Sequence, residues 1–351
     1  MNAWYKQTVT PPSEPAKVFA EIRQSKLTKP AGSLGKLEQL AVQLCSLQNT
    51  QMPKVDKVAI RVFAADHGVA AEGVSVFPQA VTVEMIKNFI GGGAAISVLA
   101  KVLSADFSAV NMGTVYPFEA EGLINSTIAR GTKNFCIEPA MSAIEFERAM
   151  LAGKVIVGDV VAKGCNCFIG GEMGIGNTTT AAAMACAILN ETPEEMVGLG
   201  TGIDDKGKQR KINVVKRALK LHCDDVSSLE QLARRLGGFE IIALAGAYTQ
   251  CAYERLPILV DGFICSVAAL LACRLNPGVR EWLIFSHQSG EQGHARVLSA
   301  MEAEPLLDLK MRLGEASGAA VALPLLRMAC DLHTNMATFS EAAVSESSAL
   351  S

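Results

Sequence analysis

The chain has 351 residues and a net charge of −3, and charged residues make up 19% of it. This balance excludes the basic surface that nucleic-acid binding or a polybasic membrane patch would require, so the expected partners are small molecules and other subunits. Hydrophobic residues make up 50% of the chain, which predicts a large buried core.

The N-terminal segment has no basic stretch followed by an apolar one, so no secretory signal is expected and the protein is assigned to the cytoplasm. The most apolar stretch, 241–275, is interrupted by Glu254, Arg255 and Asp261, and it is interpreted as core rather than as a membrane span. The ten cysteines are scattered through apolar runs. Cys165 and Cys167 lack a second pair and a nearby His, so we expect reduced cysteines and no metal site.

The first 50 residues are polar and helical in pattern, with a helix expected over 36–47. From Val58 onward, short apolar runs alternate with segments of helical composition. The expected strands are 58–63, 107–110, 165–169, 258–260 and 282–285, and the expected helices are 80–89, 94–102, 142–152, 205–221, 227–236, 262–275 and 292–302. This alternation predicts an α/β fold: a three-layer, Rossmann-like parallel sheet over 56–304, with a small helical subdomain built from both chain ends, 1–55 plus 305–351.

Small, polar or charged residues follow each expected strand, and the carboxyl ends of parallel strands share one edge of a sheet. We therefore expect one crevice formed by the segments 64–68, 111–114, 170–172, 261–262 and 286–290. Asp66 and His67 resemble a catalytic dyad. Adjacent residues of an extended chain point apart, however, so a structural role is favoured for this pair.

The most informative segment is 170–180, where a glycine-rich turn lies between a strand and a strong helix former. Asn177 or Thr178 is expected at the helix N-cap, where free N–H groups and the helix dipole favour an anion such as phosphate. Glu172 beside this turn would be costly to bury unless it serves a ligand. Further groups that could hold the same anion are Lys208, Arg210, Lys211, Ser289 and Gly290.

A second acidic candidate is Glu315, which precedes a run of small residues. A Glu in the first turn of a helix is favoured by the dipole without any catalytic duty, so the pattern alone leaves both roles open. No P-loop motif is present. The segment 174–179 approaches the dinucleotide fingerprint but has Thr in place of the third Gly, which leaves a dinucleotide-dependent oxidoreductase as an alternative.

Six ordered blocks of the chain resemble the nicotinate-nucleotide:dimethylbenzimidazole phosphoribosyltransferase family. They are 29–38 (KPAGSLGKLE), 65–69 (ADHGV), 171–179 (GEMGIGNTT), 260–263 (VDGF), 286–289 (SHQS) and 311–319 (MRLGEASGA). The resemblance implies transfer of the 5-phosphoribosyl group from nicotinate mononucleotide to 5,6-dimethylbenzimidazole in cobalamin biosynthesis, with no cofactor and no metal. It also implies a homodimer. A non-catalytic nucleotide or benzimidazole binding protein remains the other alternative.

The resemblance assigns roles to particular residues. Glu315 is implied as the catalytic base and Glu172 as a second acidic residue. The phosphate-binding positions are Gly174, Gly176, Asn177, Thr178, Lys211 and Ser289. The ribose-binding positions are Gly202 and Asp261, and the base pocket comprises Phe77, Met85, Met173 and Leu313. Phe77 and Met85 stand where relatives can have polar residues, so the preferred base is left open.

Overall fold

A computed structural model describes residues 3–198, 200, 202 and 204–345. The described strands are β1 (Val58–Ala65), β2 (Asp106–Gly113), β3 (Ile124–Asn125), β4 (Cys167–Met173), β5 (Ile258–Val260) and β6 (Leu283–Phe285). The α-helices are α1 (Glu14–Lys26), α2 (Lys36–Gln48), α3 (Ala80–Gly91), α4 (Ala95–Val102), α5 (Ala143–Ala162), α6 (Asn177–Leu189), α7 (Pro193–Met196), α8 (Asp205–His222), α9 (Leu229–Leu236), α10 (Phe239–Tyr253), α11 (Phe263–Leu275), α12 (His294–Ala300) and α13 (Ser317–Asn335).

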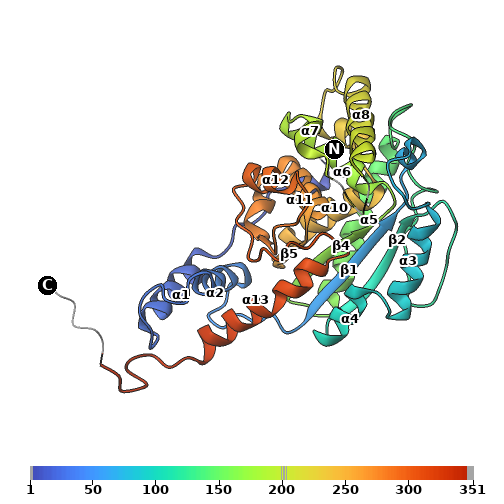
Figure 1. Cartoon of the computed structure of the whole chain (residues 1–351). Helices are drawn as coiled ribbons and strands as arrows, with labels where there is room; N and C mark the ends of the chain where they lie inside the picture. Colours follow the sequence, from blue (N-terminus) through green and yellow to red (C-terminus); the bar gives the residue numbers. More distant parts are fainter. Residues whose placement is uncertain (1–2, 199, 201, 203, 346–351) are drawn as a thin grey trace.

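The six strands form one parallel sheet in the order β3-β2-β1-β4-β5-β6. Every residue of β1 is buried, as expected for a central strand with helices on both faces. Helices α3, α4 and α13 pack on one face, while α5, α10 and α11 form the layer on the other (Figure 1). The predicted α/β fold with a parallel sheet is confirmed.

Several elements differ from the expectation: β3 and α7 were not predicted, and α5 runs to Ala162 rather than to residue 152. Helix α10 was not predicted, because nearly all of its residues are buried and it therefore shows no polar face from which a helical period could be recognised. Strand β4 runs on through Met173, whereas a loop was expected from Gly170. Glu172 therefore lies in the last part of a buried strand rather than in the turn that follows it.

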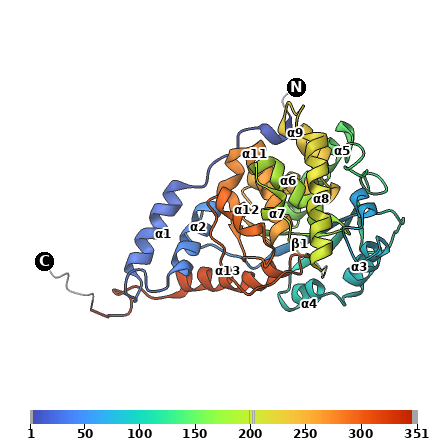
Figure 2. The same ribbon diagram turned by 45° about the horizontal axis from the view of Figure 1, so that its top comes forward.

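Helices α1 and α2 pack on each other and project from the sheet, with α13 running alongside in both views (Figures 1 and 2). The Arg23 side chain of α1 donates to the carbonyl oxygen of His333 in α13 at 2.7 Å. The first and last helices of the chain are thus joined in space, although residues 346–351 of the expected subdomain lie outside the described part of the chain.

By length and composition, one helical stretch of the described residues, Ala80–Val102, would suffice to cross a membrane. A left-handed turn at Gly92, with φ of 80°, divides this stretch into α3 and α4. Both helices pack against β2.

Candidate active site

The carboxyl ends of β4, β5 and β6 border a cavity of about 870 Å³, a volume that includes space open to solvent. Gly174 lines it after β4, Asp261 after β5 and His287 after β6. The expected crevice of five strand ends is therefore formed by three. Asp66 and His67, which follow β1, are fully buried and do not reach the cavity.

The turn from β4 into α6 forms one wall of the cavity. Gly176 is the N-cap of α6, in place of the expected Asn177 or Thr178, and its φ of 98° is a left-handed backbone that glycine adopts without strain. Asn177 and Thr178 begin the helix and line the cavity. The Asn177 amide donates to the Gly174 carbonyl at 3.1 Å and the Thr179 amide donates to the Gly176 carbonyl at 3.1 Å. The positive end of the helix dipole still faces the cavity, so this wall can hold an anion.

Of the three candidate cations on α8, only Lys211 reaches the cavity. Its ammonium donates to Thr178 Oγ1 at 3.0 Å, and burial lowers the pKa of Lys211 although the Glu291 carboxylate opposes this. Lys208 instead donates to Gln292 Oε1 at 2.6 Å, and Arg210 donates to the Gly73 carbonyl at 3.0 Å. A buried ammonium beside an open helix end is a suitable partner for a phosphate.

Ser289 also lines the cavity, but it is not a helix cap. Helix α12 begins five residues later, at His294. The Ser289 amide donates to His294 Nδ1 at 2.8 Å, and its hydroxyl accepts from the Glu291 amide at 3.3 Å. These bonds fix the serine at the cavity wall.

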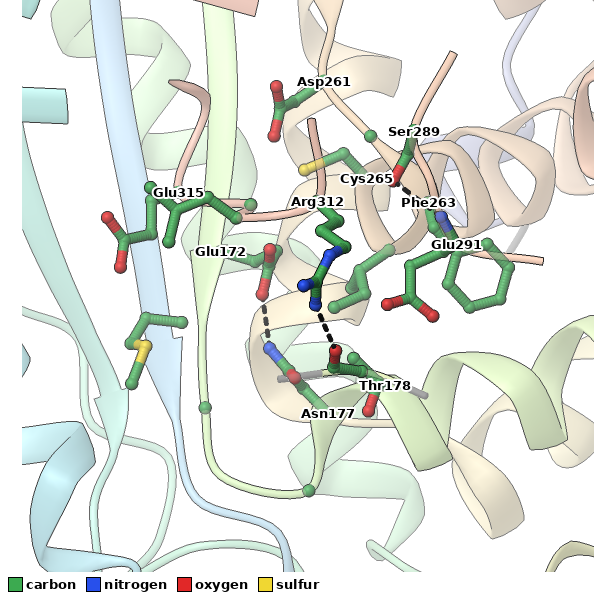
Figure 3. Close-up of a pocket in the computed structure, with 18 of the residues that line it drawn as sticks. Glu172, Asn177, Thr178, Asp261, Phe263, Cys265, Ser289, Glu291, Arg312 and Glu315 are labelled. Atoms are coloured by element: carbon green, nitrogen blue, oxygen red, sulfur yellow. Dashed lines mark hydrogen bonds between the residues drawn. The ribbon is translucent and has the colours of Figure 1, made fainter. Parts of the chain in front are cut away.

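Glu172 is buried in the wall opposite solvent and accepts a hydrogen bond from the Asn177 side-chain amide (Figure 3). Burial raises the pKa of Glu172 well above its usual value, and the charges of Asp261, Glu240 and Glu315 raise it further. This environment favours the protonated form of the Glu172 carboxyl. In that form it can donate a hydrogen bond as well as accept one.

Glu315 lies two residues before α13 instead of in its first turn. Gly314, Glu315 and Ala316 all have left-handed backbones, with φ of 82°, 61° and 69°. For Glu315 and Ala316 this conformation is strained, and such strain is concentrated at functional sites. The strained segment places the Glu315 carboxyl on the opposite side of the site from Ser289 and Glu291 (Figure 3).

Burial raises the pKa of Glu315 to about 7, and the charge of Asp261 adds to this effect. The sequence left open whether burial or the helix dipole would prevail, and burial does. A carboxyl that titrates near neutral pH is suited to accept a proton in a reaction.

Asp261 differs from Glu172 and Glu315 because its pKa is lowered, so it is ionised at neutral pH. Burial alone would raise its pKa, but hydrogen bonding and charge from His287 and the amides of Ala319 and Gly262 lower it below its usual value. The Ala319 amide donates to Asp261 Oδ1 at 2.8 Å, and His287 Nε2 lies 3.6 Å from the same oxygen. His287 had no predicted role, although it stands in one of the six blocks.

The base pocket predicted from the resemblance is only partly present at the cavity. Met173 and Leu313 line it, whereas Phe77 and Met85 do not. Phe77 is 47% exposed, two residues beyond the cavity residue Ser75, and Met85 packs against the core. Gly202 is exposed and also does not line the cavity. These three predictions are not supported by the walls of this cavity.

Besides His287, three further lining residues bear on the site although they had no predicted role. Arg312 donates to the Gly200 carbonyl at 3.2 Å and thereby closes the cavity beside Thr178. Burial raises the pKa of Glu291, which faces Lys211. Phe263 adds an apolar surface after β5. Arg312 directly precedes Leu313 in the MRLGEASGA block, and Phe263 ends the VDGF block. These two motifs were the sequence signal that could have identified both residues as part of the site. Within the described residues, no group of three His, Cys, Asp or Glu side chains has the arrangement of a metal site.

Comparisons with known proteins agree with this geometry. A family model described as phosphoribosyltransferase matches residues 9–344. Nicotinate-nucleotide–dimethylbenzimidazole phosphoribosyltransferase of Xanthomonas oryzae pv. oryzae is 54% identical over 98% of this chain and 99% of its own length. The enzyme of that name from Pseudomonas syringae pv. syringae is 53% identical with the same coverage. The crystal structure of the Thermus thermophilus enzyme of that name, 40% identical, aligns with a TM-score of 0.90 and covers 95% of this chain and 99% of its own.

Proposed function

This chain belongs to the nicotinate-nucleotide–dimethylbenzimidazole phosphoribosyltransferase family, and we propose that it moves the 5-phosphoribosyl group of nicotinate mononucleotide to 5,6-dimethylbenzimidazole. The products are nicotinate and alpha-ribazole 5′-phosphate, a step in the nucleotide-loop part of cobalamin biosynthesis. The observation that carries the proposal is Glu315, a buried carboxyl with a pKa of about 7, in the same cavity as an open helix N-terminus and Lys211.

The N-terminus of α6 is our proposed site for the phosphate of nicotinate mononucleotide. A phosphate there places a negative charge beside the buried ammonium of Lys211. That charge favours the protonated form of Lys211, which burial alone disfavours. The groups assigned to the phosphate are Gly174, Gly176, Asn177, Thr178, Lys211 and Ser289, all of which line the cavity.

The ribose then lies next to Asp261. Its ionised carboxylate can accept a hydrogen bond from a ribose hydroxyl, and its charge stabilises the positive charge that develops on the sugar as the glycosidic bond breaks. Glu172, whose protonated form is favoured by burial, acts as a supporting acid that can donate a hydrogen bond into the cavity. The pyridinium ring of nicotinate mononucleotide carries a positive charge, which suits a cavity with several carboxyl groups.

The benzimidazole lies against Met173 and Leu313, within reach of Glu315. One ring nitrogen attacks C1 of the ribose while the C1–N bond to nicotinate breaks, so that the β configuration becomes α. Glu315 accepts the proton from the other ring nitrogen. Departure converts a cationic pyridinium into a neutral ring, so no new negative charge develops on the leaving ring for a metal to neutralise. General-base assistance of this kind contributes roughly 100- to 10,000-fold, and alignment of the two reactants contributes more.

Further parts of the proposal concern the whole molecule. We propose a sheet domain over 56–304 and a helical subdomain from 1–55 with 305–351. A cytoplasmic homodimer without a membrane span is proposed from the family. Val18 and Ile22 on α1 are 44% and 50% exposed, one helical turn apart, and Met328 on α13 is 47% exposed. These apolar side chains on the projecting helices favour contact with a second copy.

The alternatives are tested by one assay. The protein is mixed with nicotinate mononucleotide and 5,6-dimethylbenzimidazole without added metal, and free nicotinate and alpha-ribazole 5′-phosphate are measured by chromatography. We expect both products in equal amounts. Nucleotide binding without release of nicotinate, tested also with other benzimidazoles and purines, would instead support the non-catalytic binding protein. Bound nicotinamide dinucleotide with hydride transfer would support the oxidoreductase.

A further inference from the structure

The Asp66-His67 dipeptide at the end of β1 was set aside as structural because its side chains were expected to point apart. They do point apart, and both are completely buried. Asp66 Oδ1 accepts a hydrogen bond from the Thr82 hydroxyl of α3 at 2.6 Å. His67 Nδ1 lies 2.9 Å from the Thr180 hydroxyl of α6. Each of these residues therefore contacts a different buried threonine.

Both threonines belong to the support of the phosphate loop, which we define as residues 174–180. The Thr82 hydroxyl accepts a hydrogen bond from the Ile175 amide, in the middle of the loop, at 3.2 Å. Thr180 itself lies in the first turns of α6, whose N-terminus forms the proposed phosphate site. Asp66 thus reaches the loop through Thr82, and His67 reaches it through Thr180.

The His67 ring is itself held in place from both sides. Glu240, at the start of α10, places its Oε1 2.8 Å from His67 Nε2, and this carboxylate is also completely buried. A Cβ atom on Gly238 would lie 2.3 Å from His67 Cε1, and one on Gly174 would lie 3.1 Å from Nε2. The ring is therefore wedged between the start of α10 and the phosphate loop, with no space for it to turn away.

We propose that Asp66 and His67 are positioning residues for the phosphate of the nucleotide substrate. Through Thr82 and Thr180 they fix the loop that, together with Lys211, holds that phosphate. This inference rests on the proposed function, because it concerns the same substrate site. It differs from a general role in packing, since the two hydroxyl links end on the phosphate loop and not on the benzimidazole pocket. Loss of a link should therefore weaken nucleotide binding selectively.

The experiment removes each hydroxyl in the full-length protein by Thr82→Val and Thr180→Val. We expect the KM for nicotinate mononucleotide to rise about five- to tenfold in each variant, the effect of losing one buried hydrogen bond. The kcat and the KM for 5,6-dimethylbenzimidazole should change less than about twofold. Thr249→Val is the matched control, because Thr249 is equally buried on α10 and its hydroxyl donates only within that helix, to the Ala245 carbonyl at 2.8 Å.

Serine and alanine variants keep the test decisive where a valine variant fails to fold. Thr180→Ser retains the hydroxyl and should retain the wild-type KM for the nucleotide, whereas Thr180→Ala should not. Equal nucleotide KM values in the serine and alanine variants would overturn the inference. The inference would also be overturned if the KM for nicotinate mononucleotide changed no more in Thr82→Val and Thr180→Val than in Thr249→Val.

A second measurement separates this inference from the proposed reaction. The rise in Tm caused by inorganic phosphate reports occupation of the loop without turnover, and we expect that rise to shrink in Thr82→Val and Thr180→Val but not in Thr249→Val. If wild-type protein released no nicotinate, the proposed reaction would fail while the phosphate measurement still tested the loop. If wild-type protein turned over but phosphate stabilised all three variants equally, the positioning role would be wrong.

Discussion

Replacing Glu315 with Gln should abolish most of the activity and at the same time stabilise the protein. Gln keeps the shape of the side chain but cannot accept the proton of the benzimidazole, so we expect kcat to fall more than about tenfold with nucleotide binding retained. The stabilisation follows from the pKa of Glu315, which rises from 4.5 to about 7 on folding. At about 1.4 kcal/mol per pH unit, ionising this carboxyl in the folded protein costs about 3 kcal/mol.

The sign of this effect depends on pH. Because folding raises the pKa of Glu315, the folded state binds the proton more tightly than the unfolded state does. The stability that this contributes is fully present below pH 4.5 and is lost as the pH rises through 7. The glutamine of Glu315→Gln does not ionise, so the variant does not lose this stability as the pH rises. At pH 8 the variant should be more stable by about 3 kcal/mol, which for a chain of this length corresponds to a Tm about 4 °C higher. At pH 5 the difference should fall to about 1 kcal/mol.

Thermal unfolding at pH 5 and pH 8, with nicotinate release measured on the same samples, provides the test. Glu230→Gln is a control with the opposite sign. Although burial raises the pKa of Glu230, its ion pair with Lys6 lowers it below the usual value. That substitution should lower Tm at pH 8 and leave turnover unchanged. Near-normal turnover of Glu315→Gln would refute the base assignment, and an unchanged Tm at pH 8 would refute the raised pKa.

The same pKa fixes the pH profile of the wild-type enzyme. The base must be ionised to accept a proton, so kcat/KM should rise with pH up to about 7 and level off above it. In Glu315→Gln the residual activity should lose this inflection. A wild-type profile that is flat between pH 5.5 and 8 would contradict the assignment.

Two further predictions concern the other walls of the cavity. Lys211→Ala should raise the KM for nicotinate mononucleotide at least about tenfold with little change in kcat, whereas Lys208→Ala on the same helix should leave both unchanged; equal kinetics in the two variants would remove Lys211 from the phosphate site. Gly314→Ala should lower stability by more than about 1 kcal/mol and reduce turnover, because its φ is 82° and a Cβ would lie 2.4 Å from Glu172 Oε1. Gly158→Ala, in α5 with open space around it, should instead raise stability by about 0.5–1 kcal/mol in urea unfolding, and a loss in that control would contradict the reasoning.

The sequence was sufficient for the parallel sheet and for many residues of the cavity, because strand ends and glycine turns have local signals. The start of β5, for example, was predicted at the observed residue, Ile258. Helix α10 could not be recognised, since a helix buried on every side has no periodicity. Gly170 and Gly171 were interpreted as the beginning of a loop, but they belong to β4, where a Cβ on Gly171 would lie 2.7 Å from the Ala316 amide. A glycine required by the approach of a distant segment looks the same in sequence as one required by a turn.

The pKa values of the site residues were harder to predict from the sequence than the identity of those residues. Whether Glu315 titrates near 4 or near 7 depends on its burial and on the charge of Asp261, which is held ionised by His287. These three residues come from different parts of the chain, so no local pattern contains the answer. Phe77 and Met85 were assigned to the base pocket by the resemblance alone; they do not line this cavity, and their role stays a prediction.

Helix α13 also sets the order in which the molecule can be completed during synthesis. Helices α1 and α2 leave the ribosome first, but α13, which packs against α2, is translated only after the whole sheet. At about 5–20 residues per second, the two early helices wait tens of seconds for this partner. The segment that leads into α13 carries Glu315. When α13 packs against α2, it covers the two early helices and also places the proton acceptor in the site. The nascent chain therefore remains without activity until its first helices are also protected.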